Sequence, residues 1–162
     1  MDDKPVSIEN RRFELDPNHA LGEIAPQFAK AFGYTADLDL DATLSQLLRL
    51  RVSQINNCTY CMNLHYEAAR NLDIPRAKID TLTAWWETDL FTPAEQAALA
   101  YTEALTRISD TTVANRFETF HQDLAAHFSD SQIVDIAGII INMNVWTRLK
   151  LAQGATPTLS DE

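Results

Sequence analysis

Turn-forming residues are scarce in this chain, which has only 4 glycines and 6 prolines among its 162 residues. This scarcity argues against an all-β fold, because many tight turns require such residues. No apolar run approaches the roughly 18 residues that suggest a membrane-spanning helix. The first residues, Met1 to Pro5, lack the basic and apolar regions of a signal peptide. The sequence therefore predicts a soluble, cytoplasmic protein.

Positive charge is also in short supply. The chain has 13 Lys and Arg residues against 23 Asp and Glu residues, which gives a formal net charge of −10. Phosphate backbones and anionic membrane surfaces repel such a chain, so we expect neither nucleic acid nor a membrane as a partner. With 46% hydrophobic residues, the composition suits one globular domain with a core of its own.

No segment alternates apolar and polar residues over the length of a strand, so we expect an all-α fold without a sheet. Two capping boxes mark helix starts, at residues 92–95 and at residues 129–132. Helices are predicted at about 20–32, 42–56, 58–71, 76–85, 93–108, 113–128 and 133–151. We expect a single-domain bundle of about six to eight helices over residues 18–152, between an N-terminal arm (1–17) and a polar C-terminal tail (153–162).

The last predicted helix is apolar on most of its circumference, with three successive isoleucines at 139–141, followed by Met143, Val145 and Trp146. A helix of this kind is buried on most sides. Two arrangements fit the pattern equally: a helix at a subunit interface, or a central core helix in a monomer.

The only two cysteines are Cys58 and Cys61, and His65 follows one turn after the second. On a helix these three side chains share one face. Residues three apart also lie within the Cα separation that a disulfide needs. A helix start and a neighbouring imidazole both favour the thiolate form of cysteine. In the cytoplasm such a pair is typically redox-active or metal-binding, and this pattern predicts a dithiol that can be oxidised and reduced.

Other interpretations of the cysteine pair remain open. The three residues are also compatible with two buried cysteines beside a core histidine, or with a redox sensor that only changes its packing. A Cys₂His metal site would lack the usual fourth ligand, because the other histidines are scattered along the chain. Haem attachment requires histidine directly after the second cysteine, where this chain has Met62. We therefore predict no metal and no cofactor.

The cysteines lie within a longer recognisable motif. The run from Leu47 to His65 reads LLRLRVSQINNCTYCMNLH, and related segments follow at 86–88, 98–105 and 144–149. These segments resemble the alkylhydroperoxidase D-like (AhpD-like) proteins of the carboxymuconolactone decarboxylase superfamily, and the similarity covers about residues 15–151. The resemblance implies an all-α fold that assembles into trimers or hexamers. It also implies thiol-dependent reduction of hydroperoxides, with a thiol or disulfide electron donor as a further partner.

The resemblance also implies a role for each site residue. Cys61 would attack the peroxide, Cys58 would resolve the product to a disulfide, and His65 would take part in a proton relay. One position departs from the family pattern. Gln46 stands where the peroxidases have a glutamate that starts the relay, and glutamine cannot accept a proton as a carboxylate does. We therefore expect a peroxidase-like enzyme of weak activity, with Gln46 as the fourth site residue.

Overall fold

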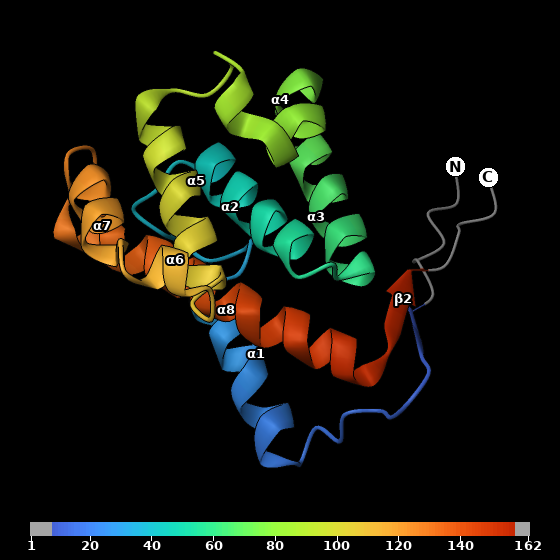
Figure 1. Cartoon of the computed structure of the whole chain (residues 1–162). Helices are drawn as coiled ribbons and strands as arrows, with labels where there is room; N and C mark the ends of the chain where they lie inside the picture. Colours follow the sequence, from blue (N-terminus) through green and yellow to red (C-terminus); the bar gives the residue numbers. More distant parts are fainter. Residues whose placement is uncertain (1–7, 158–162) are drawn as a thin grey trace.

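The computed structural model describes residues 8–157, and in this range the chain forms eight α-helices, one 3₁₀ helix and two short strands (Figure 1). In chain order they are β1 (Ile8–Asn10), α1 (Ala20–Phe32), α2 (Ala42–Ile55), α3 (Thr59–Asn71), α4 (Arg76–Thr81), the 3₁₀ helix η1 (Leu82–Glu87), α5 (Pro93–Thr106), α6 (Thr111–Ala114), α7 (Phe117–Ala125), α8 (Asp130–Gln153) and β2 (Ala155–Pro157). The prediction of an all-α bundle is confirmed.

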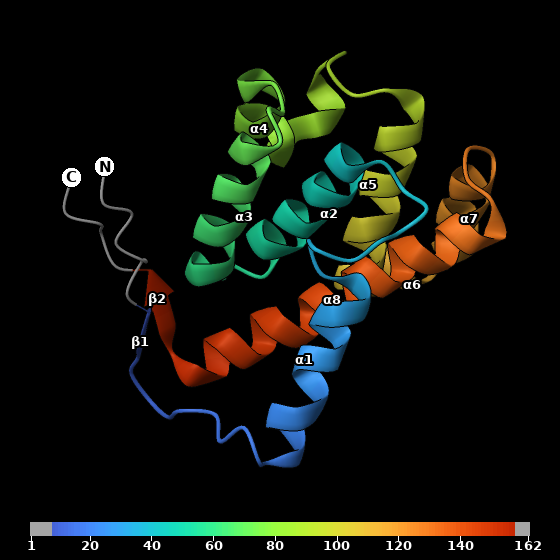
Figure 2. The ribbon, with the colours of Figure 1, turned by 180° about the vertical axis from the view of Figure 1, so that it is seen from behind.

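Helix α2 is the centre of the molecule. It lies between α3 and α5 and crosses α8, as Figures 1 and 2 show from opposite sides. Every residue from Leu44 to Ser53 is buried, including Gln46, Arg49 and Arg51. A helix buried all round normally carries few polar side chains, because each needs a partner when it leaves water. The buried polar side chains of α2 are therefore candidates for a function other than packing.

Most helix starts follow from capping chemistry. The side chain of Asp41 accepts a hydrogen bond from the backbone N–H of Leu44 at 3.0 Å, and both predicted capping boxes form, at Thr92 and at Ser129. The expected helix over 113–128 is wrong in detail. It is divided into α6 and α7 by a break at Asn115 and Arg116. Neither residue is a proline or a glycine, so the sequence does not indicate the break.

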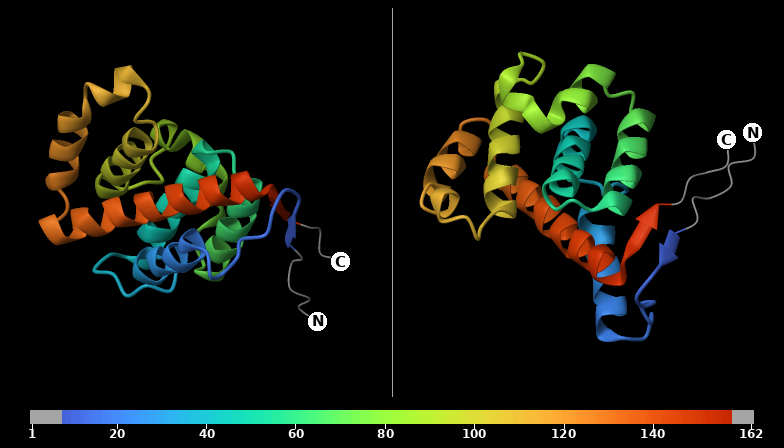
Figure 3. Two further views of the ribbon diagram at one scale, coloured as in Figure 1. Left: turned by 90° about the horizontal axis from the view of Figure 1, so that it is seen from below. Right: turned by 45° about the vertical axis from the view of Figure 1, so that its right-hand side comes forward.

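The expectation of no sheet also needs a correction. β1 and β2 pair in antiparallel fashion, with Ile8 opposite Pro157 and Asn10 opposite Ala155 (Figure 3). Three residues per strand are too few to show a periodic pattern in the sequence. The pairing joins part of the predicted arm to part of the predicted tail. Residues 1–7 and 158–162 of those segments lie outside the described part of the chain, and the three-part division stays a prediction.

Helix α1 packs on α8 through a close approach at Gly138. A Cβ atom at this position would lie 2.3 Å from Cε1 of Phe32, so only glycine fits while that ring stays in place. The contact fixes the C-terminal end of α1 against the bundle. It thereby places the carbonyls of Phe32 and Gly33 where they accept hydrogen bonds from Arg49 of α2.

Helix α8 is buried on one side only. Ile136, Ile139 and Ile140 are completely buried in the core, whereas Val134 is 64% exposed and Ile141 is 47% exposed. The helix therefore belongs to the core of the single chain and also presents apolar side chains to the outside. Within residues 8–157, no helix combines the length and the apolar character needed to cross a membrane.

Candidate functional site

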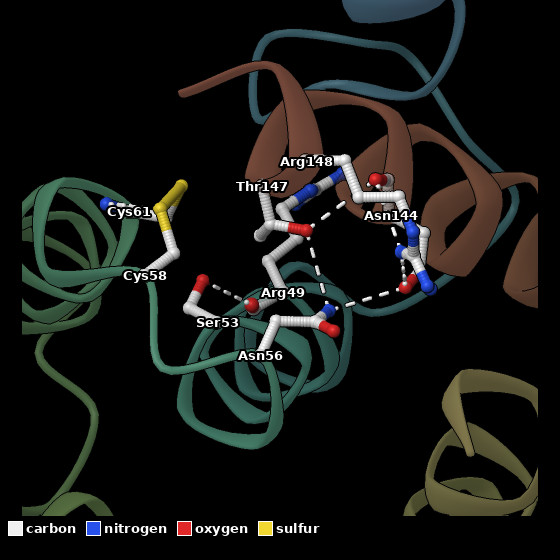
Figure 4. The surroundings of a disulfide bond; sticks show 8 residues. All are labelled: Arg49, Ser53, Asn56, Cys58, Cys61, Asn144, Thr147 and Arg148. Atoms are coloured by element: carbon white, nitrogen blue, oxygen red, sulfur yellow. Dashed lines mark hydrogen bonds between the residues drawn. A yellow bond between two sulfur atoms is a disulfide. The ribbon is translucent and has the colours of Figure 1, made fainter. Parts of the chain in front are cut away.

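The two cysteines lie at the start of α3, directly after a sharp turn. Asn57 adopts a left-handed conformation, with φ of 52°, which reverses the chain between α2 and α3. Cys58 is the N-cap of α3, and its sulfur accepts a hydrogen bond from the backbone N–H of Cys61. The two residues form a disulfide with a Cα–Cα distance of 5.2 Å (Figure 4). The predicted compatibility of this spacing with a disulfide is confirmed.

Polar contacts from α8 hold the turn that precedes the cysteines. The side-chain amide of Asn56 donates hydrogen bonds to Asn144 Oδ1 at 3.1 Å and to Thr147 Oγ1 at 3.2 Å (Figure 4). Asn144 in turn accepts from Arg148. These contacts connect the end of α2 to α8 and so determine where α3 begins. The segment 144–149 therefore supports the cysteines through the turn.

Gln46 and His65 are in direct contact, although they are far apart in the sequence. The Nε2 atom of Gln46 lies 2.9 Å from Nδ1 of His65 and 3.0 Å from the backbone oxygen of His65. A carbonyl oxygen only accepts, so Nε2 must be a donor group, and the same NH₂ donates to Nδ1. His65 therefore carries its proton on Nε2. In this tautomer the imidazole is a hydrogen-bond donor toward its surroundings and cannot accept a second proton at Nδ1 without losing Gln46.

The surroundings keep His65 neutral. Burial, together with the nearby positive charge of Arg49, lowers its pKa from 6.5 to about 3. The ring is 4% exposed. At neutral pH the imidazole is therefore uncharged, so it can stabilise a thiolate by donating a hydrogen bond but supplies no positive charge.

A cavity of about 430 Å³ opens beside the disulfide, between α1, α2, α3 and α8. Its walls are formed by Ala29, Lys30, Gly33, Tyr34, Thr35, Arg49, Tyr60, Cys61, Leu64, His65, Asn142, Met143, Trp146 and Lys150. Cys61 lines this cavity and Cys58 does not. A small molecule in the cavity is therefore closer to Cys61 than to Cys58.

Arg49 brings an uncompensated charge to this cavity. It is 4% exposed, and its NH2 group donates to the carbonyls of Phe32 at 3.1 Å and Gly33 at 2.8 Å. Its Nε has no hydrogen-bond partner in the described part of the chain. Burial lowers the pKa of Arg49 to about 10, which still leaves it charged at neutral pH.

The four predicted site residues thus lie together, with Cys58 behind the cavity wall and Gln46 behind His65. The sequence analysis missed Arg49, Asn142 and Lys150, which line the same cavity. The only signal for Arg49 was a charged residue within a helix of mostly apolar residues. Among residues 8–157, no group of three or more His, Cys, Asp and Glu side chains is placed to hold a metal ion, so the Cys₂His alternative gains no support.

Comparison with known proteins agrees with this site. The family model "Carboxymuconolactone decarboxylase family" matches residues 23–104, which include α2, the cysteine pair and His65. This chain belongs to the carboxymuconolactone decarboxylase family. A relative from Bacillus subtilis (strain 168), the uncharacterized protein YdfG, is 35% identical over 136 residues, which cover 82% of this chain and 90% of YdfG. The AhpD-like resemblance is thereby confirmed at the level of the family.

Solved structures share the fold. One from Agrobacterium tumefaciens, described as a protein of unknown function and a candidate antioxidant defence protein AhpD, superposes with a TM-score of 0.78 and 25% identity over 87% of this chain and 92% of that chain. An uncharacterized peroxidase-related protein from Silicibacter sp. TM1040 gives a TM-score of 0.71 and 23% identity over 84% of this chain and 69% of that chain. The second likeness establishes the fold alone.

Proposed function

We propose that this protein is a thiol-dependent oxidoreductase that reduces hydroperoxides through a Cys58–Cys61 dithiol/disulfide cycle. The observation that carries the proposal is a disulfide whose second cysteine forms the wall of a cavity, beside a buried histidine. A structural disulfide has no need of such access, whereas a reactive thiol requires it. The related structure described as a candidate antioxidant defence protein supports the same assignment.

The cycle balances with one external dithiol. In the reduced protein, the thiolate of Cys61 attacks one peroxide oxygen, the O–O bond breaks, and the other oxygen leaves as an alcohol after it takes up a proton. Cys61 is then a sulfenic acid. Cys58 attacks its sulfur, the S–O bond breaks, water leaves, and the disulfide forms. The external dithiol then reduces the disulfide by exchange and becomes oxidised itself.

In this scheme, Gln46 and His65 determine how fast Cys61 reacts with the peroxide. His65 presents Nε2–H, which can donate to the thiolate or to the leaving oxygen, but neither residue can take the thiol proton. General-base assistance contributes about 10²–10⁴-fold to proton-transfer steps. We therefore infer that the native protein is a slow peroxidase, in which Cys61 loses its proton to water. Gln46 also borders a second cavity, of about 260 Å³, although its own side chain is completely buried.

The substitution Gln46→Glu tests this inference. A carboxylate at this position accepts from Nδ1–H of His65, so the other ring nitrogen becomes free to accept the thiol proton. We expect the second-order rate of Cys61 oxidation to rise at neutral pH, in stopped-flow mixing with peroxide, and His65→Ala in the wild-type background to lower it. Gln54→Glu is the matched control, because it makes the same change on the same helix away from His65. A folded Gln46→Glu variant that is no faster than wild type would contradict the proposed relay.

Turnover is tested in a peroxide-reduction assay with dithiothreitol as the electron donor. The wild type should consume peroxide, and Cys61→Ser should lose this activity. The main alternative for this cysteine pair is a redox sensor without catalysis. Formation of one disulfide per chain without continued peroxide consumption would favour that sensor over the enzyme.

We further propose a cytoplasmic homo-oligomer, a trimer or a hexamer, with α8 at the interface. The support is the pair of exposed residues Val134 and Ile141, which are seven apart and so lie on one face of the helix. Light scattering should give a mass several times the 18.2 kDa of the chain. A mass of one chain that does not change on dilution would contradict this proposal.

A further inference from the structure

We propose that the cavity at Cys61 is a binding site for an organic carboxylate with an apolar body. If the proposed function holds, this carboxylate is the hydroperoxide substrate itself. The juxtaposition that carries the proposal is a set of unpaired cations around an apolar cavity, with the reactive sulfur in its wall.

The charge around the cavity is of one sign. Among residues 8–157, Lys30, Arg49 and Lys150 line it, and no Asp or Glu does. The chain as a whole is acidic, with a net charge of −10, so this cationic lining contrasts with its composition. In the described part of the chain, neither Arg49 nor Lys150 forms an ion pair. Arg49 is held out of water without a counter-charge, and a cation in this position favours the binding of an anion.

Two donors in the cavity wall have no partner. Nε of Arg49 and Nε1 of Trp146 are both buried and form no hydrogen bond among the described residues. A buried donor without a partner costs free energy, which a bound ligand can recover. The guanidinium of Arg49 is held in place by the carbonyls of Phe32 and Gly33. It is therefore oriented before any ligand arrives, as a carboxylate site requires.

Lys150, like Arg49, has no carboxylate partner among the described residues. Its amine lies 5.0 Å from the ring centre of Tyr60 and 5.7 Å from that of Trp146, so in the described part of the chain its charge faces aromatic rings and no carboxylate. The same rings, together with Leu64 and Met143, give the cavity its apolar wall. A bare peroxide molecule would leave most of the 430 Å³ empty. An organic molecule with one anionic end uses both the cations and the apolar wall.

One buried acceptor also belongs to a residue that lines the cavity. Oδ1 of Asn142 is buried in the cavity wall and has no hydrogen-bond partner in the described residues. A carboxylate offers it no donor, but a hydroperoxide has an O–H group that does. A molecule with a carboxylate at one end and a hydroperoxide at the other therefore matches the donors and the acceptor together.

Binding is tested first, without any chemistry. Isothermal titration of the purified protein with 4-isopropylbenzoate should show binding that weakens with salt, whereas 4-isopropylbenzamide should bind at least about tenfold more weakly. Arg49→Met and Lys150→Met should each weaken benzoate binding about tenfold. Arg70→Met is the matched control, because it removes an exposed cation of α3 that does not line the cavity. Equal binding of the acid and the amide, or no binding of the acid, would overturn the inference.

The second test compares two closely similar hydroperoxides, cumene hydroperoxide with a para-carboxylate and the methyl ester of that acid. The wild type should have a kcat/KM at least about tenfold higher for the acid, and Lys150→Met should bring the two values together. The ratio within each variant cancels any effect on the thiolate. If neither peroxide is turned over but benzoate binds as expected, the proposed peroxidase function fails and the carboxylate site stands. If both are reduced at equal rates, the carboxylate site fails and the peroxidase stands.

Discussion

The two buried arginines of α2 have opposite surroundings. Arg51 donates from Nε to Oε1 of Glu103 at 2.8 Å, and its NH2 lies 2.7 Å from the same oxygen. Glu103 also accepts from Nε1 of Trp85 at 2.9 Å and pairs with Arg107 at 3.0 Å. Arg49 lies two residues earlier on the same helix, and among the described residues its hydrogen-bond partners are two backbone carbonyls. One arginine is part of a closed polar network, and the other faces a cavity with its charge unpaired.

The difference shows which part of the core serves stability and which part serves the site. The hydrogen-bonded ion pair of Arg51 and Glu103 connects α2 to α5 and η1. Its loss should therefore lower the free energy of unfolding. An unpaired buried cation stabilises nothing by itself, because its desolvation is not offset by a counter-charge. Its presence beside Cys61 and His65 is explained by what the cavity binds. The experiments below separate these two roles.

The largest expected effect is on the paired side. Glu103→Gln leaves Arg51 buried beside a neutral partner, and we expect the free energy of unfolding to fall by about 3–5 kcal/mol. Denaturant unfolding measures this change. Arg107→Gln is the control, since this exposed partner should cost no more than about 1 kcal/mol. A loss below about 1 kcal/mol for Glu103→Gln would mean that the paired network does not support the fold.

The next effect lies on the cavity side and depends on pH. The folded state holds the pKa of His65 at about 3, below the 6.5 of an ordinary histidine. Between these two pH values, His65 is protonated in the unfolded chain but neutral in the folded chain. The free energy of unfolding therefore decreases as the pH falls. This group alone should cost about 1.4 kcal/mol per pH unit below pH 6.5. Full stability from this source is present above that pH.

Unfolding curves from pH 7 to pH 4.5 test this dependence. His65→Asn should remove the extra slope, so its stability should decline less steeply with falling pH than that of the wild type. His121→Asn, at an exposed position, should keep the wild-type slope. Parallel curves for wild type and His65→Asn would show that the buried imidazole does not stay neutral in the folded state.

The smallest effect should come from Arg49. Replacing it with methionine removes two hydrogen bonds to carbonyls but also removes an unpaired buried charge, and the two contributions oppose each other. We expect the free energy of unfolding to change by less than about 1.5 kcal/mol, measured as for Glu103→Gln. A loss of 3 kcal/mol or more would contradict the contrast between the two arginines, because Arg49 would then be a structural residue.

The sequence was sufficient to predict the helices that begin with a recognisable capping motif. The capping boxes at Thr92 and Ser129 place α5 and α8 correctly, because the cap is a local interaction. It was not sufficient for the break between α6 and α7, which has no proline or glycine. The pairing of β1 with β2 also escaped, since it depends on two chain segments at opposite ends of the sequence.

The site divides in the same way. Cys58, Cys61 and His65 are close along one helix, so their spacing alone groups them. Gln46 is reached only through the family resemblance, because its contact with His65 joins two helices. Arg49 and Lys150 were not predicted. Their common cavity exists only once α1, α2, α3 and α8 have packed, and no pattern within one helix indicates it.

The most direct measurement is chemical trapping of the oxidised cysteine. The reduced Cys58→Ser variant is treated with one equivalent of peroxide in the presence of dimedone, which labels sulfenic acids, and is digested for mass spectrometry. We predict a dimedone adduct on Cys61, and no adduct on Cys58 when Cys61→Ser is treated in the same way. An unlabelled Cys61, or a label on Cys58 in the second variant, would contradict the assignment of Cys61 as the residue that attacks the peroxide.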